Sequence, residues 1–254
     1  GRPGHARRDG FLRASVLFLT RLAGVGMISV VIPALNEEEP IAAVVRDCLT
    51  TGLPQEVIVV DNGSTDRTAE NARAAGARVV SEPTPGYGRA CAAGVRALSS
   101  ESDIVVFLDG DGSDCPEFMP QLVEPIRRGE KDFVIGSRTR GKRERGSMNF
   151  QQVFAGRVAG ALVRLFYGVS YSDMCPFRAI RHDVLKKLEM KETTYGWNLE
   201  MQMRAARARL RILEVPVNHR CRTGGESKVS GTLRGTFVAG ARIIATLFRV
   251  AFER

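Results

Sequence analysis

The stretch that most constrains the fold is the run Ile104–Gly112, with the sequence IVVFLDGDG. Its five leading apolar residues are rich in β-branched types and too few for a buried helix, so they predict an interior strand of a parallel sheet. The strand runs directly into Asp109 and Asp111, and the glycine after each acid lets the chain turn sharply out of the sheet. Open α/β sheets bind ligands at the carboxyl ends of their strands. We therefore expect both carboxylates to lie at a binding site.

The spacing of these two acids predicts a cation site. Carboxylate oxygens are the hard donors that Mg²⁺ or Mn²⁺ prefers, and such an ion is often shared with the phosphates of a ligand. Acid-glycine turns are also common in loops that bind nothing. The pair therefore needs support from the rest of the chain.

Further strands alternate with helices along the first half of the sequence. Apolar runs predict strands over 28–33, 56–61 and 77–80, and helical patterns separate them. This alternation predicts an α/β fold with a mostly parallel central sheet and helices on both faces. Polar residues follow three of the strands, which would bring them to one edge of the sheet: Glu37, Asp61, Asn62, Asp109 and Asp111. The sequence has neither GxGxxG after its first strand nor a GxxxxGK[ST] motif, which argues against a dinucleotide fold and a P-loop ATPase.

The composition indicates an anionic partner. Lysine and arginine number 37 against 28 acidic residues, a formal net charge of +9. Phosphorylated ligands, nucleic acid or an acidic membrane surface would fit this excess. With one tryptophan, the chain has little stacking surface for single-stranded nucleic acid, and we expect no nucleic-acid partner. Five scattered cysteines without a CxxC pair indicate a reducing compartment and no zinc site.

The chain divides into three predicted parts. Residues 1–26 read as an extension outside the fold, residues 27–230 as one domain, and residues 231–254 as an amphipathic, basic C-terminal helix. The apolar face of that helix would either pack back on the domain or lie in a membrane interface. No apolar run reaches the length needed to cross a bilayer. We expect a cytoplasmic protein held peripherally on the inner face of the membrane.

Six stretches carry a resemblance to a known family. Val30–Glu38, Val59–Asp66 and Leu108–Gly112 resemble the family-2 glycosyltransferases of the GT-A fold, a single Rossmann-like nucleotide-sugar-binding domain. Three later stretches are similar to the dolichyl-phosphate mannose synthase branch: Asp132–Arg138, Tyr195–Glu200, and Glu214–Val217 with Arg222–Lys228. The resemblance implies a metal-dependent, inverting enzyme that transfers mannose or glucose from a nucleotide-diphosphate sugar to a polyprenyl phosphate.

The resemblance also implies residue roles. Asp109 and Asp111 would hold the metal, Asp111 on the donor diphosphate, and Arg138 would bind the acceptor phosphate. The donor site would comprise Pro33, Leu35, Glu37, Val60, Asp61, Asn62, Asp109, Gly110, Arg222, Ser227 and Lys228. The chain departs from the family pattern at Asn62, where a second Asp is common, and at Ser113, where the synthases often have Gln. Gln151 and Gln152 stand where the synthases tend to have Arg and Ser.

The acceptor decides whether a base is needed. A phosphate oxygen is already anionic, whereas a hydroxyl must lose a proton to a group such as Glu200. The alternative for Glu200 is a structural ion pair with Arg204 one helical turn away. Two other readings of the function stay open: transfer to a hydroxyl acceptor (a sugar, glycerate or lipid), and a nucleotide-sugar-binding module without turnover. His182 and His219 have no partner at metal-ligand spacing and are expected at the surface or at helix caps.

Overall fold

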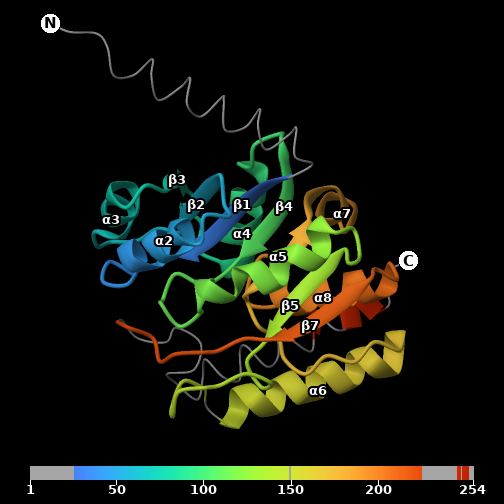
Figure 1. The fold of residues 1–254 in the computed structure, drawn as a ribbon. Helices are drawn as coiled ribbons and strands as arrows, with labels where there is room; N and C mark the ends of the chain where they lie inside the picture. The colour runs from blue at the N-terminus through green and yellow to red at the C-terminus, as the bar shows by residue number, and fades with distance from the viewer. Residues whose placement is uncertain (1–25, 149, 225–244, 247, 252–254) are drawn as a thin grey trace, which may run out of the picture.

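The computed structural model describes residues 26–148, 150–224, 245–246 and 248–251. Within them the chain alternates strands and helices (Figure 1). The strands are β1 (Met27–Ala34), β2 (Glu56–Asp61), β3 (Arg78–Ser81), β4 (Ser102–Phe107), β5 (Phe133–Ser137), β6 (Arg178–Arg181) and β7 (Ile212–Pro216). The helices are α2 (Ile41–Thr50), α3 (Thr68–Ala74), α4 (Tyr87–Arg96), α5 (Met119–Arg127), α6 (Phe150–Tyr167), α7 (His182–Lys187) and α8 (Trp197–Arg207), with a 3₁₀ turn at Pro116–Phe118.

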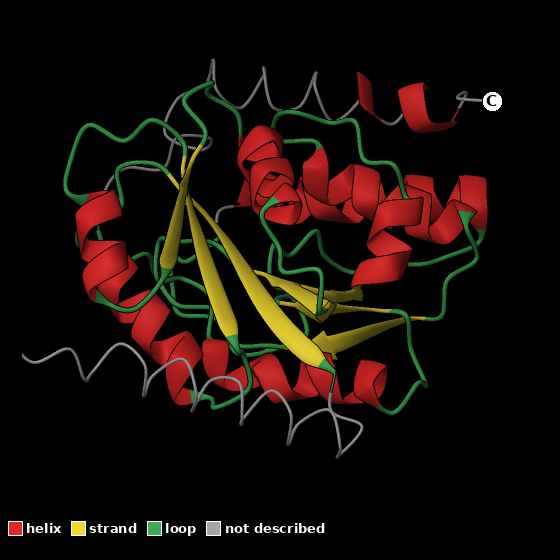
Figure 2. Ribbon diagram, turned by 90° about the horizontal axis from the view of Figure 1, so that it is seen from above, coloured by secondary structure: helices red, strands yellow, loops and turns green. Residues whose placement is uncertain are grey.

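The described strands form one sheet in the order β3-β2-β1-β4-β6-β5-β7. Neighbouring strands are parallel except β6, which is antiparallel to both β4 and β5. Helices cover both faces of the sheet (Figure 2). The predicted α/β class and mostly parallel sheet are thus confirmed, and the predicted strands lie within one or two residues of the observed ones. The central strands β1, β2 and β4 are almost fully buried, as their runs of Val and Ile require.

The sequence does not predict strand β6, because its residues lack the apolar pattern of a buried strand. It has four residues, RAIR, with an arginine at each end. Arg178 is nevertheless fully buried. Its guanidinium donates to the carbonyl oxygens of Cys175 and Asn198 and lies over the Phe133 ring, 5.9 Å from the centroid. These backbone acceptors satisfy a cation that the sequence alone places at the surface.

Glycines in α4 let this helix approach its neighbours closely. A Cβ at Gly94 would lie 2.3 Å from Cγ1 of Val31 in β1, and one at Gly88 would lie 2.3 Å from the carbonyl oxygen of Glu192. Any side chain at either position would therefore push α4 away. The close fit sets Tyr87, the first residue of α4, beside the acids that follow β4.

Candidate active site

The acids after β4 belong to a tight, hydrogen-bonded turn. The backbone N–H of Asp109 donates to Oδ2 of Asp114 at 3.0 Å. Ser113 donates to Oδ1 of Asp111 from its backbone N–H at 2.9 Å and from its hydroxyl at 2.6 Å. The hydroxyl of Tyr87 donates to Oδ1 of Asp109 at 3.0 Å. Both predicted metal ligands are thus held in fixed orientations by neighbouring groups.

A second loop, residues 219–223, lies against this turn. The backbone N–H of Thr223 donates to the carbonyl of Asp111 at 3.2 Å, and that of Arg220 donates to the carbonyl of Ser113 at 2.9 Å. The loop brings Arg222 to the carboxylates, where its Nη2 lies 2.9 Å from Oε1 of Glu37 and 3.1 Å from Oδ2 of Asp111. Residues separated by more than a hundred positions therefore meet at one edge of the sheet.

The electrostatics of this edge favour a bound cation. Burial, reinforced by the negative charges of Asp111 and Asp114, raises the pKa of Asp109. Burial also raises the pKa of Asp114, and the charge of Asp111 adds to that effect. Closely spaced carboxylates that resist ionisation become stable as anions when a cation neutralises them. The Arg222 guanidinium, which lies between Glu37 and Asp111, already occupies such a cationic position.

A cavity of about 580 Å³ opens at this edge. Nine of the predicted site residues line it: Pro33, Leu35, Glu37, Asn62, Asp109, Gly110, Asp111, Arg138 and Arg222. Tyr87, Tyr195, Ser113 and His219 line it too. The cavity therefore joins the acids to Arg138, the arrangement on which the sequence-based hypothesis depends.

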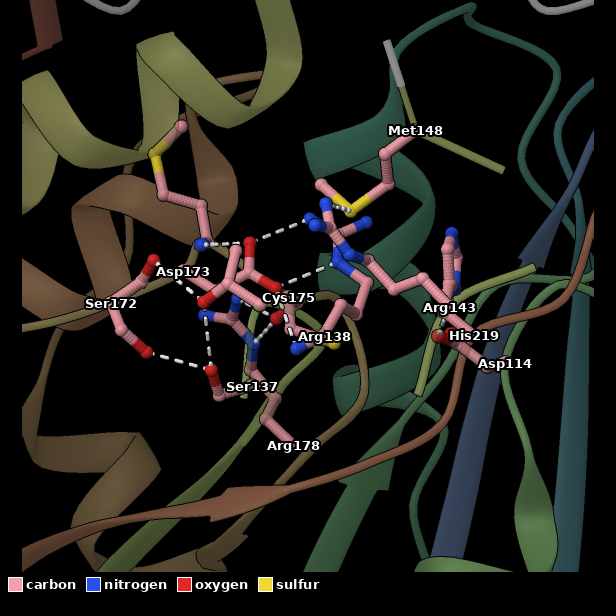
Figure 3. A network of polar contacts seen from close by, with 12 residues as sticks. Asp114, Ser137, Arg138, Arg143, Met148, Ser172, Asp173, Cys175, Arg178 and His219 are labelled. Atoms are coloured by element: carbon pink, nitrogen blue, oxygen red, sulfur yellow. Dashed lines mark hydrogen bonds and ion pairs between the residues drawn. The ribbon is translucent and has the colours of Figure 1, made fainter. Parts of the chain in front are cut away.

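Arg138, which lines the cavity, forms a buried ion pair with Asp173 (Figure 3). Its Nε and Nη2 each donate to a carboxylate oxygen of Asp173 at 2.8 Å, and its backbone N–H donates to Oδ2 at 2.9 Å. Burial opposes both charges, but the hydrogen bonds between the partners prevail, so the pKa of Arg138 is raised and that of Asp173 is lowered. The pair stays ionised and fixes the plane of the guanidinium.

Among the predicted donor residues that the structure describes, two do not line the cavity. Val60 is fully buried within β2. Asp61 ends β2, and its Oδ1 accepts from the backbone N–H of Ser64 at 3.0 Å, so it caps the turn after the strand. Asn62 does line the cavity, but its amide binds the carbonyls of Glu82 and Thr84 and the N–H of Gly86. This side chain thereby positions the loop that leads into α4.

The structure places Glu200, predicted as a catalytic base, away from the cavity. Its side chain is completely buried and is not among the residues that line the cavity. It accepts from the backbone N–H groups of Lys191 and Glu192 and pairs with Arg204 at 3.0 Å and Arg249 at 3.3 Å. The alternative reading, a structural pair with Arg204 one turn along α8, is the one the structure shows.

The position of His219 also differs from expectation. The imidazole is 6% exposed, lines the cavity, and places Nδ1 3.9 Å from Oδ1 of Asp114. Burial lowers the pKa of His219 to about 4, so the ring is neutral at pH 7. His182 is buried as well, with Nδ1 2.8 Å from the carbonyl of Ser102. The spacing of residues along the sequence does not reveal that His219 lies at the cavity, because its neighbour Asp114 belongs to another loop.

Ser227 and Lys228, predicted for the donor site, lie outside the described residues, as do residues 1–25 and most of 231–254. The described part of the C-terminal segment packs on the fold. Val250 is fully buried, and Thr246 and Arg249 each contact a carboxylate oxygen of Glu192 at 2.9 Å. None of the helices in the described ranges has the length and apolar character to span a bilayer.

Comparison with known proteins identifies the family. Residues 29–189 match the family described as glycosyl transferase family 2. The chain belongs to this family. An uncharacterized glycosyltransferase of Mycobacterium tuberculosis is 38% identical over 216 residues, covering 84% of this chain and 94% of the relative.

Two further relatives carry names that state a transfer reaction. A dolichyl-phosphate hexose transferase of Haloferax volcanii is 35% identical over 231 residues, covering 89% of this chain and 94% of that protein. An undecaprenyl-phosphate mannosyltransferase of Micrococcus luteus is 34% identical over 222 residues, covering 82% and 89%.

Among solved structures, glucosyl-3-phosphoglycerate synthase of M. tuberculosis, in complex with Mn²⁺, UDP-glucose and phosphoglyceric acid, is similar to this chain with a TM-score of 0.73. The sequence identity is 29%, with 99% of this chain and 85% of the synthase covered. The sheet order and this likeness give the chain the GT-A glycosyltransferase fold. The predicted family and fold are therefore confirmed.

Proposed function

We propose that the chain is an inverting glycosyltransferase that moves a hexose, mannose or glucose, from a nucleotide-diphosphate sugar to a polyprenyl phosphate. One observation carries the proposal. A single cavity joins the acidic turn to Arg138, while the carboxylate expected to serve as a base, Glu200, is buried elsewhere. A fixed guanidinium at the cavity, with Glu200 outside it, suits an acceptor that is already anionic and needs no base.

On the donor side, Pro33 near the end of β1 and Leu35 just after it line the cavity. Their side chains offer apolar surface to the nucleobase of the donor. Glu37 lies beside them and is 7% exposed. Asn62 holds the loop at Pro85 and Gly86, which forms the adjacent wall. The diphosphate would then lie over Asp109 and Asp111, within reach of Arg222.

The residues at the acidic turn fit a divalent cation, Mg²⁺ or Mn²⁺. Asp109 and Asp111 supply hard oxygen ligands, and Arg222 already places positive charge against Asp111. No group of three or more His, Cys, Asp or Glu side chains within the described ranges is arranged to hold a metal ion. Asp109 and Asp111 would be the residues that hold the ion. When bound, such an ion stabilises the negative charge of a departing nucleoside diphosphate.

On the acceptor side, Arg138 would bind the phosphate of the polyprenyl chain. Asp173 accepts from its Nε and Nη2 and so fixes the plane of a guanidinium that lines the cavity. An acceptor oxygen would attack the anomeric carbon opposite the leaving diphosphate, so that the new carbon–oxygen bond forms as the old one breaks. No proton is transferred, and the configuration at that carbon inverts.

A second candidate is transfer to a hydroxyl of a soluble phosphorylated acceptor, such as phosphoglycerate. The likeness to glucosyl-3-phosphoglycerate synthase favours it. His219, whose imidazole lines the cavity and is neutral, would then be the candidate to take the proton.

One assay separates the candidates. The protein is incubated with labelled GDP-mannose or UDP-glucose, with Mn²⁺ or Mg²⁺, and with either polyprenyl phosphate or 3-phosphoglycerate. Label that moves into organic solvent and is released by mild acid supports the lipid acceptor. Label on a small water-soluble product supports the second candidate. A failure of both acceptors, with intact donor binding measured by calorimetry, would favour a binding module without turnover.

A further inference from the structure

Helix α6 is apolar on two opposite faces. One face packs on the fold: Ala159 and Val163 are buried, and a Cβ at Gly160 would lie 2.1 Å from the carbonyl oxygen of Tyr171. The other face presents Phe154, Val158 and Leu165, which are 57%, 41% and 76% exposed. We call these three residues the apolar stripe.

The stripe follows helical geometry. Val158 and Leu165 lie seven residues apart, so they point in directions only about 20° apart around the helix axis. Val163 points about 160° away from Leu165. A helix on the surface of a soluble fold ordinarily turns polar residues to solvent on its outer face. Here the outer face is apolar, which indicates that something other than water covers it.

The charges around the stripe indicate what that partner is. Residues 138–167 carry seven basic side chains and one acidic side chain, Glu144. The basic residues of the loop before α6 are exposed apart from the half-buried Arg138, and α6 itself adds Arg157 and Arg164, both exposed. An apolar helix face bordered by arginines matches an anionic membrane surface, where the phenylalanine ring and the aliphatic side chains enter the acyl boundary and the arginines reach the headgroups.

The loop also connects this surface to the cavity. Arg138, at the start of the segment, lines the cavity, and Gly146 and Ser147 line it just before α6 begins. Helix α6 lies along the edge of the molecule remote from β1, β2 and β3 (Figure 1). A lipid whose phosphate is bound by Arg138 could therefore extend its chain toward the same surface that the stripe would enter.

We propose that α6 and the basic loop before it form a membrane-binding surface for bilayers that contain anionic lipid. The choice of a bilayer as partner rests on the proposed lipid acceptor, because the acceptor would reach Arg138 from that bilayer. The surface itself is a separate property of the chain and is tested separately.

The test measures binding of the full chain to vesicles of phosphatidylcholine with and without phosphatidylglycerol, by co-sedimentation. The variant is Val158→Glu with Leu165→Glu, and the matched control is Leu49→Glu on α2, where the leucine is 39% exposed. The double variant should bind anionic vesicles at least about tenfold more weakly, since each lost side chain removes apolar burial and adds repulsion. The control should bind as the unchanged chain does. Added salt should weaken binding by the unchanged chain.

Equal vesicle binding by the double variant and the unchanged chain would overturn the inference, as would no binding by either. Conversion from dimer to monomer in the double variant, without a change in vesicle binding, would assign the stripe to a second copy of the chain and also overturn it. Transfer to a short, detergent-dispersed polyprenyl phosphate tests the proposed function independently. Vesicle binding without that transfer would refute the lipid acceptor alone, and transfer without vesicle binding would refute the membrane surface alone.

Discussion

Replacing Asp173 by Asn tests the ion pair that orients Arg138. The carboxylate is 3% exposed and accepts four hydrogen bonds, three from Arg138 and one from the backbone N–H of Met174. Asn has the same shape but carries no charge and replaces one oxygen with an NH₂ group. If its oxygen takes the Oδ2 position, the NH₂ group faces the Nη2 donor of Arg138 and the Met174 N–H, so two bonds are lost.

The magnitude follows from burial. Removing one partner of a buried pair typically costs about 3–5 kcal/mol, because the other charge is left without compensation. Two hydrogen bonds survive in Asp173→Asn, so we expect the low end, about 3 kcal/mol. For a chain of this size the melting temperature should fall by roughly 6–12 °C. Arg138 would also lose its fixed plane, so the KM for the acceptor should rise more than the Kd for the donor.

The measurements are thermal unfolding by circular dichroism, donor binding by calorimetry, and transfer kinetics at saturating donor. Asp183→Asn is the matched control, because Asp183 pairs with Arg181 at 2.9 Å with half of its side chain exposed. An exposed pair contributes at most about 1 kcal/mol. The reasoning fails if Asp173→Asn is no less stable than the control, or if donor affinity falls as much as acceptor use.

Three further predictions address other residues. Asp111→Ala should stay folded and lose transfer to below about a tenth of the original rate; more activity in a steady-state assay would exclude its metal role. Glu200→Gln should lower stability by about 3 kcal/mol, while kcat at a temperature where the variant is folded stays within about twofold. A fall in kcat of about 100-fold or more would show that Glu200 acts as a general base. The pKa of Asp132 is lowered to about 2, chiefly by hydrogen bonds from Arg211. The stability gained from the carboxylate should therefore be complete above about pH 4 and lost as the pH falls toward 2. In denaturant titrations across this range, the gap between Asp132→Asn and the unchanged chain should close; a constant gap would contradict the assignment.

The parallel half of the fold could be predicted because its strands carry their own signal. In β1, β2 and β4 nearly every residue is buried on both faces, so a continuous run of Val and Ile marks each strand. Strand β6 gives no such signal, because Arg178 is buried only where Cys175 and Asn198 supply carbonyl acceptors. Those acceptors come from the loop before β6 and from α8, and no local pattern contains them.

The residues of the candidate site also fall into two groups, those that follow strands and those that packing between distant segments brings in. Asp109, Asp111 and Glu37 follow strands directly, so the sheet itself brings them to one edge. His219 and Tyr87 enter through packing between distant segments: a loop laid on the acidic turn, and a helix seated by small residues. The position of Glu200 depends on a third such contact, since Arg249 is 49 positions further along the chain. The sequence alone gives no local pattern for these contacts between distant segments.

Arg222 links the two kinds of residue. It contacts Glu37 after β1 and Asp111 after β4, so its guanidinium lies where the proposed function requires a divalent cation. Two cations within about 3 Å of one carboxylate oxygen repel each other strongly. The side chain of Arg222 would therefore rotate away from Asp111 when a metal-bound donor enters. The loop need not move with it, because the backbone bonds from Thr223 to Asp111 and from Arg220 to Ser113 do not involve that side chain. The displaced guanidinium would remain beside the cavity and close to the diphosphate, whose negative charge grows as the sugar departs.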